Sequence, residues 1–306
     1  MHFDMSVETF LTVLYCVIDE LYQTHAPHLL AGKVGAKPEF SDSEVLTLMI
    51  AQHWCGFQKE ATWLRFVQNN YLDLFPRLLD QSQFNRRARN LYWLLNSLRQ
   101  KILQQMQVLQ ETIRLIDGTP IHVRHWRRYG PGHLMLPEAA LGHCAAKKET
   151  FYGYRLVVLT TPDGVITDWE LIPANADERE AAWDMLYEYR DLLCLGDKGF
   201  LEQLRQQVLQ EDRDVILLTP KRKNQHAQNP EGWDAVMNRA RRLIETTFSQ
   251  SKDGFGMEKP FARTLWGLIS RVIAKLTGMT LVAKFNKQNG RSPLTLAGFK
   301  FGFISH

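Results

Sequence analysis

The feature that most constrains this chain is a series of short β-type runs, interleaved with helical segments, that begins near residue 112. The β-type runs cover 112–117, 154–161, 165–172, 192–197 and 215–218. The helical patterns that alternate with them cover 178–190, 199–210 and 233–251. Asp163 and Gly164 separate two of the runs, which is a strong hairpin signal. The order predicts an α/β fold, a mixed sheet with helices on its faces.

The first third of the chain has the apolar spacing of helices. We expect helices at 7–22, from a capping box at Ser41–Glu44 onward, at 59–70 and at 82–108. Gly56 separates the second helix from the third, which is compatible with helix-turn-helix geometry and equally with two ordinary packed helices. This pattern predicts an all-helical N-terminal region over residues 1–110.

The remaining residues divide into a sheet domain over 111–288 and a C-terminal tail over 289–306. The last helix, expected at 264–284, is rich in Leu, Ile, Val and Met, so we expect it to pack on the sheet, with a dimer contact as the alternative.

No run of about eighteen uncharged apolar residues occurs, and the N-terminus does not resemble a signal peptide. The 4 cysteines are scattered, which fits a reducing cytoplasm. We therefore expect a cytoplasmic protein with no membrane partner.

Positive charge is concentrated toward the C-terminus. Residues 220–306 hold 15 Lys and Arg against 5 Asp and Glu, which suggests a polyanionic partner. A second basic segment, 81–128, interleaves cations with Tyr and Trp, a pattern that suits nucleic-acid contact and also a solvated helix with a buried aromatic side. The candidates for phosphate contact there are Arg86, Arg87, Arg89, Arg124, Arg127 and Arg128. The long connection expected from 118 to 153 would reach over the nucleic acid.

Two of the expected strands end in aspartate, at Asp117 and Asp197. On neighbouring strands, both carboxylates would emerge at one edge of the sheet and repel each other. A divalent cation with oxygen ligands, Mg²⁺ or Mn²⁺, would remove that penalty. The helix at 233–251 offers Asp234 and Glu245 as a third acid. Glu245 shares a helical face with Arg241 and Lys252, as a surface ion-pair stripe also would.

These motifs resemble the DDE transposases of bacterial insertion sequences, and within them insertion-sequence family nine-eight-two. The first aspartate lies in Ile116-Asp117-Gly118-Thr119-Pro120 and the second in Leu195-Gly196-Asp197-Lys198-Gly199-Phe200. Gly153-Tyr154-Arg155-Leu156 resembles the family's second strand, and Asn175-Ala176-Asp177-Glu178-Arg179 the start of the following helix. Arg241, Glu245 and Lys252 fit the spacing of the Tyr-Arg-Glu-Lys signature, whose tyrosine position is Asn238 here.

The resemblance implies a ribonuclease-H-like catalytic fold preceded by a DNA-binding region. It implies that Asp117, Asp197 and Glu245 are catalytic and bind two Mg²⁺ ions, with Mn²⁺ able to substitute. Arg241 and Lys252 would contact DNA phosphates or the transposon end, and Lys198 could neutralise a phosphate oxygen or be a solvent-exposed lysine. The partners would be terminal inverted repeats, target DNA and a second copy of the chain in a homodimer.

Three alternatives follow from the same residues. A nuclease of the same fold would cut DNA without strand transfer, and a regulator descended from a transposase would bind DNA without cutting it. Four histidines of the stretch 118–153, with Cys144, could form a zinc site, although their irregular spacing favours DNA-contacting or solvent-exposed side chains. These histidines are His122, His125, His133 and His143.

Overall fold

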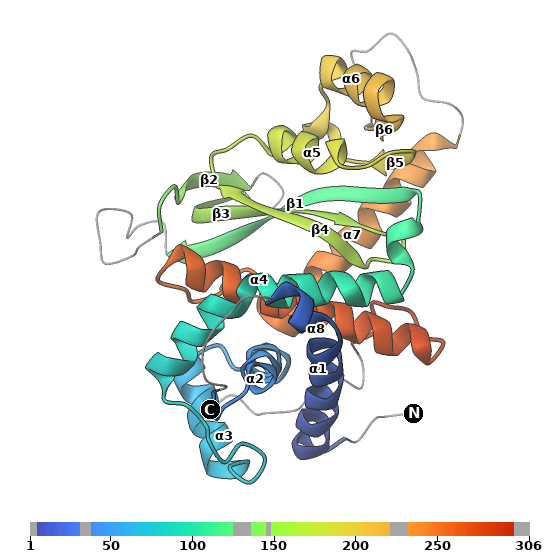
Figure 1. The fold of residues 1–306 in the computed structure, drawn as a ribbon. Helices are drawn as coiled ribbons and strands as arrows, with labels where there is room; N and C mark the ends of the chain where they lie inside the picture. The colour runs from blue at the N-terminus through green and yellow to red at the C-terminus, as the bar shows by residue number, and fades with distance from the viewer. Residues whose placement is uncertain (1–4, 31–37, 125–135, 145–147, 221–231, 297–306) are drawn as a thin grey trace.

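The computed structural model describes residues 5–30, 38–124, 136–144, 148–220 and 232–296. It confirms a mixed α/β sheet flanked by helices and preceded by a helical region (Figure 1). The helices are α1 (Val7–Leu29), α2 (Asp42–Trp54), α3 (Glu60–Asn70), α4 (Gln81–Gln105), α5 (Glu178–Tyr187), α6 (Gln203–Arg213), α7 (Trp233–Phe255) and α8 (Leu265–Gln288). The strands are β1 (Ile113–Arg124), β2 (Ala140–Cys144), β3 (Glu149–Thr160), β4 (Ile166–Pro173), β5 (Leu192–Leu195) and β6 (Val215–Leu218).

The strands form one six-stranded mixed sheet. The order β2-β3-β1-β5-β6 is completed by β4, which pairs with β3. β1, β3 and β4 are antiparallel, whereas β5 and β6 continue the sheet in parallel with β1. The predicted hairpin is the β3–β4 pair, whose turn contains Gly164 at φ +89°. β1 is therefore the central strand, with an antiparallel neighbour on one side and a short parallel one on the other.

Helices cover both faces of the sheet (Figure 1). One face packs Ile116, Val157 and Leu159 against residues of α5 and α6. The other face packs Leu115 and Leu195 against α7, and further strand residues against α8. Because side chains alternate along a strand, Leu115 and Ile116 point to opposite faces, and this alternation fixes where the next residue, Asp117, points.

The interpretation of 118–153 as one long connection is wrong. β1 continues through Arg124, β2 follows at Ala140, and β3 begins at Glu149. Gly118 and Pro120, at the start of the expected connection, both lie in β1 beyond the last residue that pairs with β5. On that open edge the backbone N–H of His122 donates to Glu258 O at 2.7 Å. Strand alternation directs the position of Pro120 to the same edge, where its missing N–H costs no sheet hydrogen bond.

The helical region and the sheet share α8. One side of α8 contributes Ile273 and Leu281 to the core formed by α1, α2, α3 and α4. Its other side contributes Leu268 and Val272 to the core beneath the sheet. Among the described residues this is the one helix long and apolar enough to cross a membrane, but 72% of its apolar window is buried inside the protein. Its composition is therefore explained by its two packed sides.

Candidate active site

Asp117 lies in the middle of β1 rather than at the end of a strand, as the sequence suggested. It stands where the parallel neighbour stops, because the β1–β5 pairing ends at Leu115 opposite Leu195. Asp117 comes two residues after Leu115, and Asp197 comes two residues after Leu195. The two aspartates therefore lie at the same level, just beyond the paired residues of the two strands. Asp117 shares its face with Leu115, the face covered by α7.

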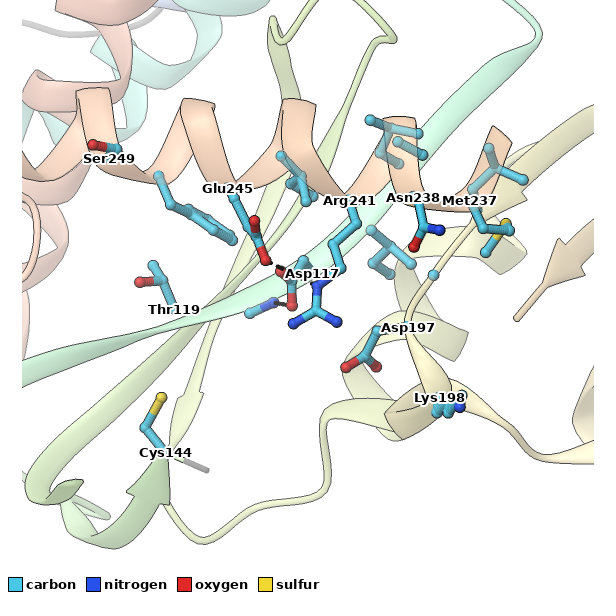
Figure 2. Close-up of a pocket in the computed structure, with 18 of the residues that line it drawn as sticks. Asp117, Thr119, Cys144, Asp197, Lys198, Met237, Asn238, Arg241, Glu245 and Ser249 are labelled. Atoms are coloured by element: carbon cyan, nitrogen blue, oxygen red, sulfur yellow. Dashed lines mark hydrogen bonds and ion pairs between the residues drawn. The ribbon is translucent and has the colours of Figure 1, made fainter. Parts of the chain in front are cut away.

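Helix α7 places Glu245 over that face. Its buried residues Met237, Ala240 and Ile244 pack on Leu115 and Leu195 and fix the rotation of the helix. The neighbouring stripe along the same helix lines a cavity of about 880 Å³ together with Asp117, Asp197 and Lys198. The members of this stripe are Asn238, Arg241, Glu245, Ser249 and Lys252. The cavity thus gathers residues from β1, from the loop after β5 and from α7 (Figure 2).

The surroundings of Asp117 disfavour the ionised form of its carboxyl group. Burial, with the nearby Asp197 and Glu245 carboxylates adding to its effect, raises the pKa of the Asp117 carboxyl group to about 7. The hydrogen bond from Gly118 N to Asp117 Oδ1, at 2.7 Å, and the Arg241 guanidinium oppose this rise. A pKa raised by burial and by two like charges in a cavity is typical of a functional site.

Arg241 is the positive charge among these acids. Its Nε donates to Glu245 Oε1 at 2.9 Å, and its guanidinium lies between Asp117 and Asp197 in Figure 2. Both partners of this pair are more than half exposed, so the pair contributes little to stability. Farther along α7, Lys252 Nζ lies 3.4 Å from Glu258 Oε2.

Asp197 differs from Asp117 in being exposed. It follows β5 and caps a short 3₁₀ helix, Lys198–Phe200, by accepting from Gly199 N at 2.6 Å. Gly199 therefore opens this 3₁₀ turn, and α6 begins only at Gln203. Lys198 also lines the cavity.

The donor set suits a hard divalent cation, because three carboxylates from three elements line one cavity and their mutual repulsion raises the pKa of Asp117. Within the described ranges, however, no three His, Cys, Asp or Glu side chains lie close enough together to form a metal-binding group. The Arg241 guanidinium is paired with one of the carboxylates, that of Glu245. The residues therefore fit the ion in the chemistry of their donor atoms.

An ion pair lies on the opposite face of β1. Its two residues belong to the sequence motifs described above, but the motifs did not show that they pair. Arg155 of β3 pairs with Glu178, the first residue of α5, and Arg155 Nη2 donates to His143 O at 3.1 Å. A Cβ at Gly118 would lie 2.4 Å from Glu178 Oε2. Gly118 is thus the residue whose missing side chain lets this pair support β1 directly behind Asp117.

The arginines predicted from the basic segment have diverse positions. Arg87 donates to Phe40 O and pairs with Asp42, so its guanidinium is engaged inside the helical region. Arg89 is half-buried, with Nε 3.4 Å from Asn85 O, whereas Arg86 is exposed. Arg124 is half-buried at the end of β1. Arg127 and Arg128 lie outside the described residues, as do His125 and His133.

Two further cations of the same segment are core residues. Arg99 and Arg114 are fully buried. Arg99 donates to Ile166 O, to Thr167 O at 3.3 Å and to Thr280 Oγ1 at 3.2 Å. Of the candidate zinc ligands, His122 stacks on Phe151 and lies 3.5 Å from Glu149. Sequence reasoning also missed Cys144 and Ser249 as lining residues of the cavity, and it gave no role to Thr119 although this residue lies in the first aspartate motif.

Comparison with known proteins gives one informative match. A family model described as a transposase DDE domain matches residues 107–264. Two solved structures, the Mos1 transposase paired-end complex with left transposon end and a pre-cleavage Mos1 transpososome, are each 12% identical and cover 92% of this chain and 98% of theirs. Their TM-scores of 0.23 and 0.21 are too low to support a shared fold. No curated protein sequence matches.

Proposed function

Because this chain belongs to the transposase DDE domain family, we propose that it cleaves the ends of an insertion sequence and transfers the 3′-hydroxyl strands to target DNA by two-metal-ion phosphoryl transfer. The single observation that carries the proposal is the cavity of about 880 Å³ that Asp117, Asp197 and Glu245 line together from three separate elements. Their placement around one space large enough for a phosphodiester is what such chemistry needs.

We assign the three acids the role of binding divalent cations, Mg²⁺ with Mn²⁺ as a substitute. Two bound ions would supply activation of water or a 3′-hydroxyl and stabilisation of the leaving oxygen. The protein's own contribution is positional. Asp117 is held by a central strand and by its bond from Gly118 N, and Glu245 by a helix packed on that strand. Asp197, in its exposed loop, is the most adjustable of the three.

We propose that the cations of the cavity hold the scissile strand. Arg241, Lys252 and Lys198 line the same space as the acids and would bind phosphate oxygens of the transposon end. In the absence of DNA, Arg241 neutralises the carboxylates, so DNA binding would draw its guanidinium toward a phosphate. Arg86, Arg89, Arg124, Arg127 and Arg128 are proposed as further DNA contacts, and Arg87 is not, because its guanidinium is already paired.

Finer assignments complete the proposal. Membership in insertion-sequence family nine-eight-two rests on the motifs, with Asn238 at the position of the signature tyrosine and inside the cavity. We propose a homodimer that pairs two terminal inverted repeats before joining them to target DNA. The residues 1–110 would contribute DNA binding, and the protein would act in the cytoplasm, associated with the nucleoid.

The test uses the purified protein, Mg²⁺ and duplexes that carry the inverted repeats flanking its reading frame. Asp117→Asn and Glu245→Gln should each lose at least about a hundredfold in cleavage, since they remove metal ligands, while retaining binding to the DNA end. Glu211→Gln, an exposed acid on α6, is the matched control and should cleave normally. Cleavage without strand-transfer products would favour the nuclease, and end binding without cleavage by the unmodified protein would favour the regulator. Full cleavage by Asp117→Asn would refute the assigned site.

A further inference from the structure

The turn between α7 and α8 leaves the cavity at Glu258 and is held rigidly. A buried lysine and a half-buried arginine of α8 bind its carbonyls. Lys275 Nζ donates to Gly256 O at 2.6 Å, and Arg271 Nη1 donates to Pro260 O at 2.8 Å and to Phe261 O at 3.1 Å. The bond from His122 N to Glu258 O ties the same turn to β1. The turn is therefore a fixed part of the rim of the cavity.

This rigid segment exposes two large aromatic side chains. Phe261 is 48% exposed, and Trp266, in the first turn of α8, is 54% exposed. Phe261 also has φ +55°, a left-handed conformation that an aromatic residue adopts rarely and only where its surroundings enforce it. Trp266 contacts Tyr92 of α4, with 5.6 Å between ring centroids, which fixes the indole while leaving about half of it in water. Neither aromatic is needed for the core.

Cations are interleaved with these aromatics. Lys259 and Arg263 are exposed and have no ion-pair partner within the described part of the chain. The acid nearest in sequence, Glu258, is engaged by Lys252. Exposed aromatic faces beside unneutralised cations are the chemistry that binds single-stranded nucleic acid, because bases stack on the rings while the cations meet the phosphates.

We propose that the α7–α8 turn binds unpaired DNA nucleotides next to the scissile phosphate, with Phe261 and Trp266 stacking on bases and Lys259 and Arg263 meeting phosphates. The proposal rests on the proposed function in one respect, that DNA occupies the cavity. The three residue steps from Glu258 to Phe261 span at most about 10 Å. A strand that rises about 3.4 Å per nucleotide reaches the turn within a few nucleotides of the cavity. The turn would hold the end of a strand once it has separated from its complement.

The experiment measures binding of a fluorescein-labelled twelve-nucleotide oligo(dT) by anisotropy, at low salt and without metal. Phe261→Ala and Trp266→Ala should each weaken binding by about fivefold or more, the loss expected when one stacked base is released. Phe261→Tyr and Trp266→Phe, which keep an aromatic ring, should restore it. Leu204→Ala removes an even more exposed apolar side chain, 72% exposed on α6, and should change nothing.

Two results would overturn the proposal. One is unchanged oligo(dT) binding by both alanine variants with thermal unfolding like that of the unmodified protein. The other is unchanged oligo(dT) binding together with a shift from dimer to monomer in sedimentation, which would make this surface a contact between two copies of the chain. Because the assay contains no metal and scores no cleavage, its failure leaves the proposed active site untouched. A failure of the Asp117→Asn test would likewise leave this binding result standing.

Discussion

The cations where the helical region meets the sheet differ from those along α7 in their burial and in the groups that they contact. Arg99, Arg114 and Lys275 are almost fully buried and bond to backbone carbonyls. Arg241 and Lys252 are at least half exposed and pair only with acids at the cavity. Both groups add equally to the positive charge of the sequence, yet only the second can meet a polyanion. The comparison shows that a basic segment indicates a DNA-binding surface only through its exposed cations, because the buried ones cannot contact DNA.

The largest stability effect should come from Arg99. Arg99→Ala removes a guanidinium that joins α4 to β4 and α8, takes one donor from each of its three acceptors and opens a cavity. We expect a loss of about 4 kcal/mol in the free energy of unfolding, measured by urea denaturation. Arg86→Ala, on the exposed side of the same helix, should cost no more than about 0.5 kcal/mol. Equal losses for the two variants would erase the distinction between buried and exposed cations.

Lys275 should make stability depend on pH. Burial, with the neighbouring Arg271 charge adding to it, lowers the pKa of Lys275 from 10.5 to about 7 in the folded protein. Between these values the unfolded chain holds a proton that the folded protein has released, so this residue makes stability rise with pH across that window. The slope is at most about 1.4 kcal/mol per pH unit.

Lys275→Met should abolish this contribution, which is read as the difference between two pH series of urea denaturation. His53 and Arg271 face the same ammonium group, and the burial that lowers the pKa of His53 keeps it neutral across the window. Both residues remain in the variant, so their contributions to the pH dependence of stability cancel when the two pH series are subtracted. Parallel pH curves for the two proteins would mean that Lys275 stays charged where it is buried.

Arg155 is intermediate, half-buried and paired with Glu178 behind Gly118. Arg155→Met should cost about 3 kcal/mol, because it leaves the Glu178 carboxylate unpaired in a partly buried place. Adding Glu178→Met should recover part of that loss, since the double variant buries no unpaired charge. Chemical denaturation of the two single variants and the double variant measures the coupling. A double variant that loses the sum of the single losses would show that the two side chains act independently.

The sequence predicts the elements of this molecule better than the positions of its side chains. Periodicity located the helices and the β3–β4 hairpin, and two short apolar runs indicated that Asp117 and Asp197 lie at one level, which is just beyond the paired residues of β1 and β5. It did not reveal that β1 continues past Pro120, because that depends on where β5 stops pairing. Nor could it separate Arg99 from Arg86, since burial is decided by which other helix packs against each side of α4.

The smallest effect on stability, and the most specific effect on DNA, should come from Arg241 and Lys252. Each change to Gln should alter the free energy of unfolding by no more than about 0.5 kcal/mol, because both side chains are exposed. If each meets one phosphate, the slope of log affinity for the DNA end against log salt should become less steep by about 1. Arg242→Gln is the matched control, an exposed arginine on α7 that does not line the cavity. Because a phosphate bound in the cavity would meet Arg241 and not Arg242, an equal slope change in both variants would place the DNA elsewhere on α7.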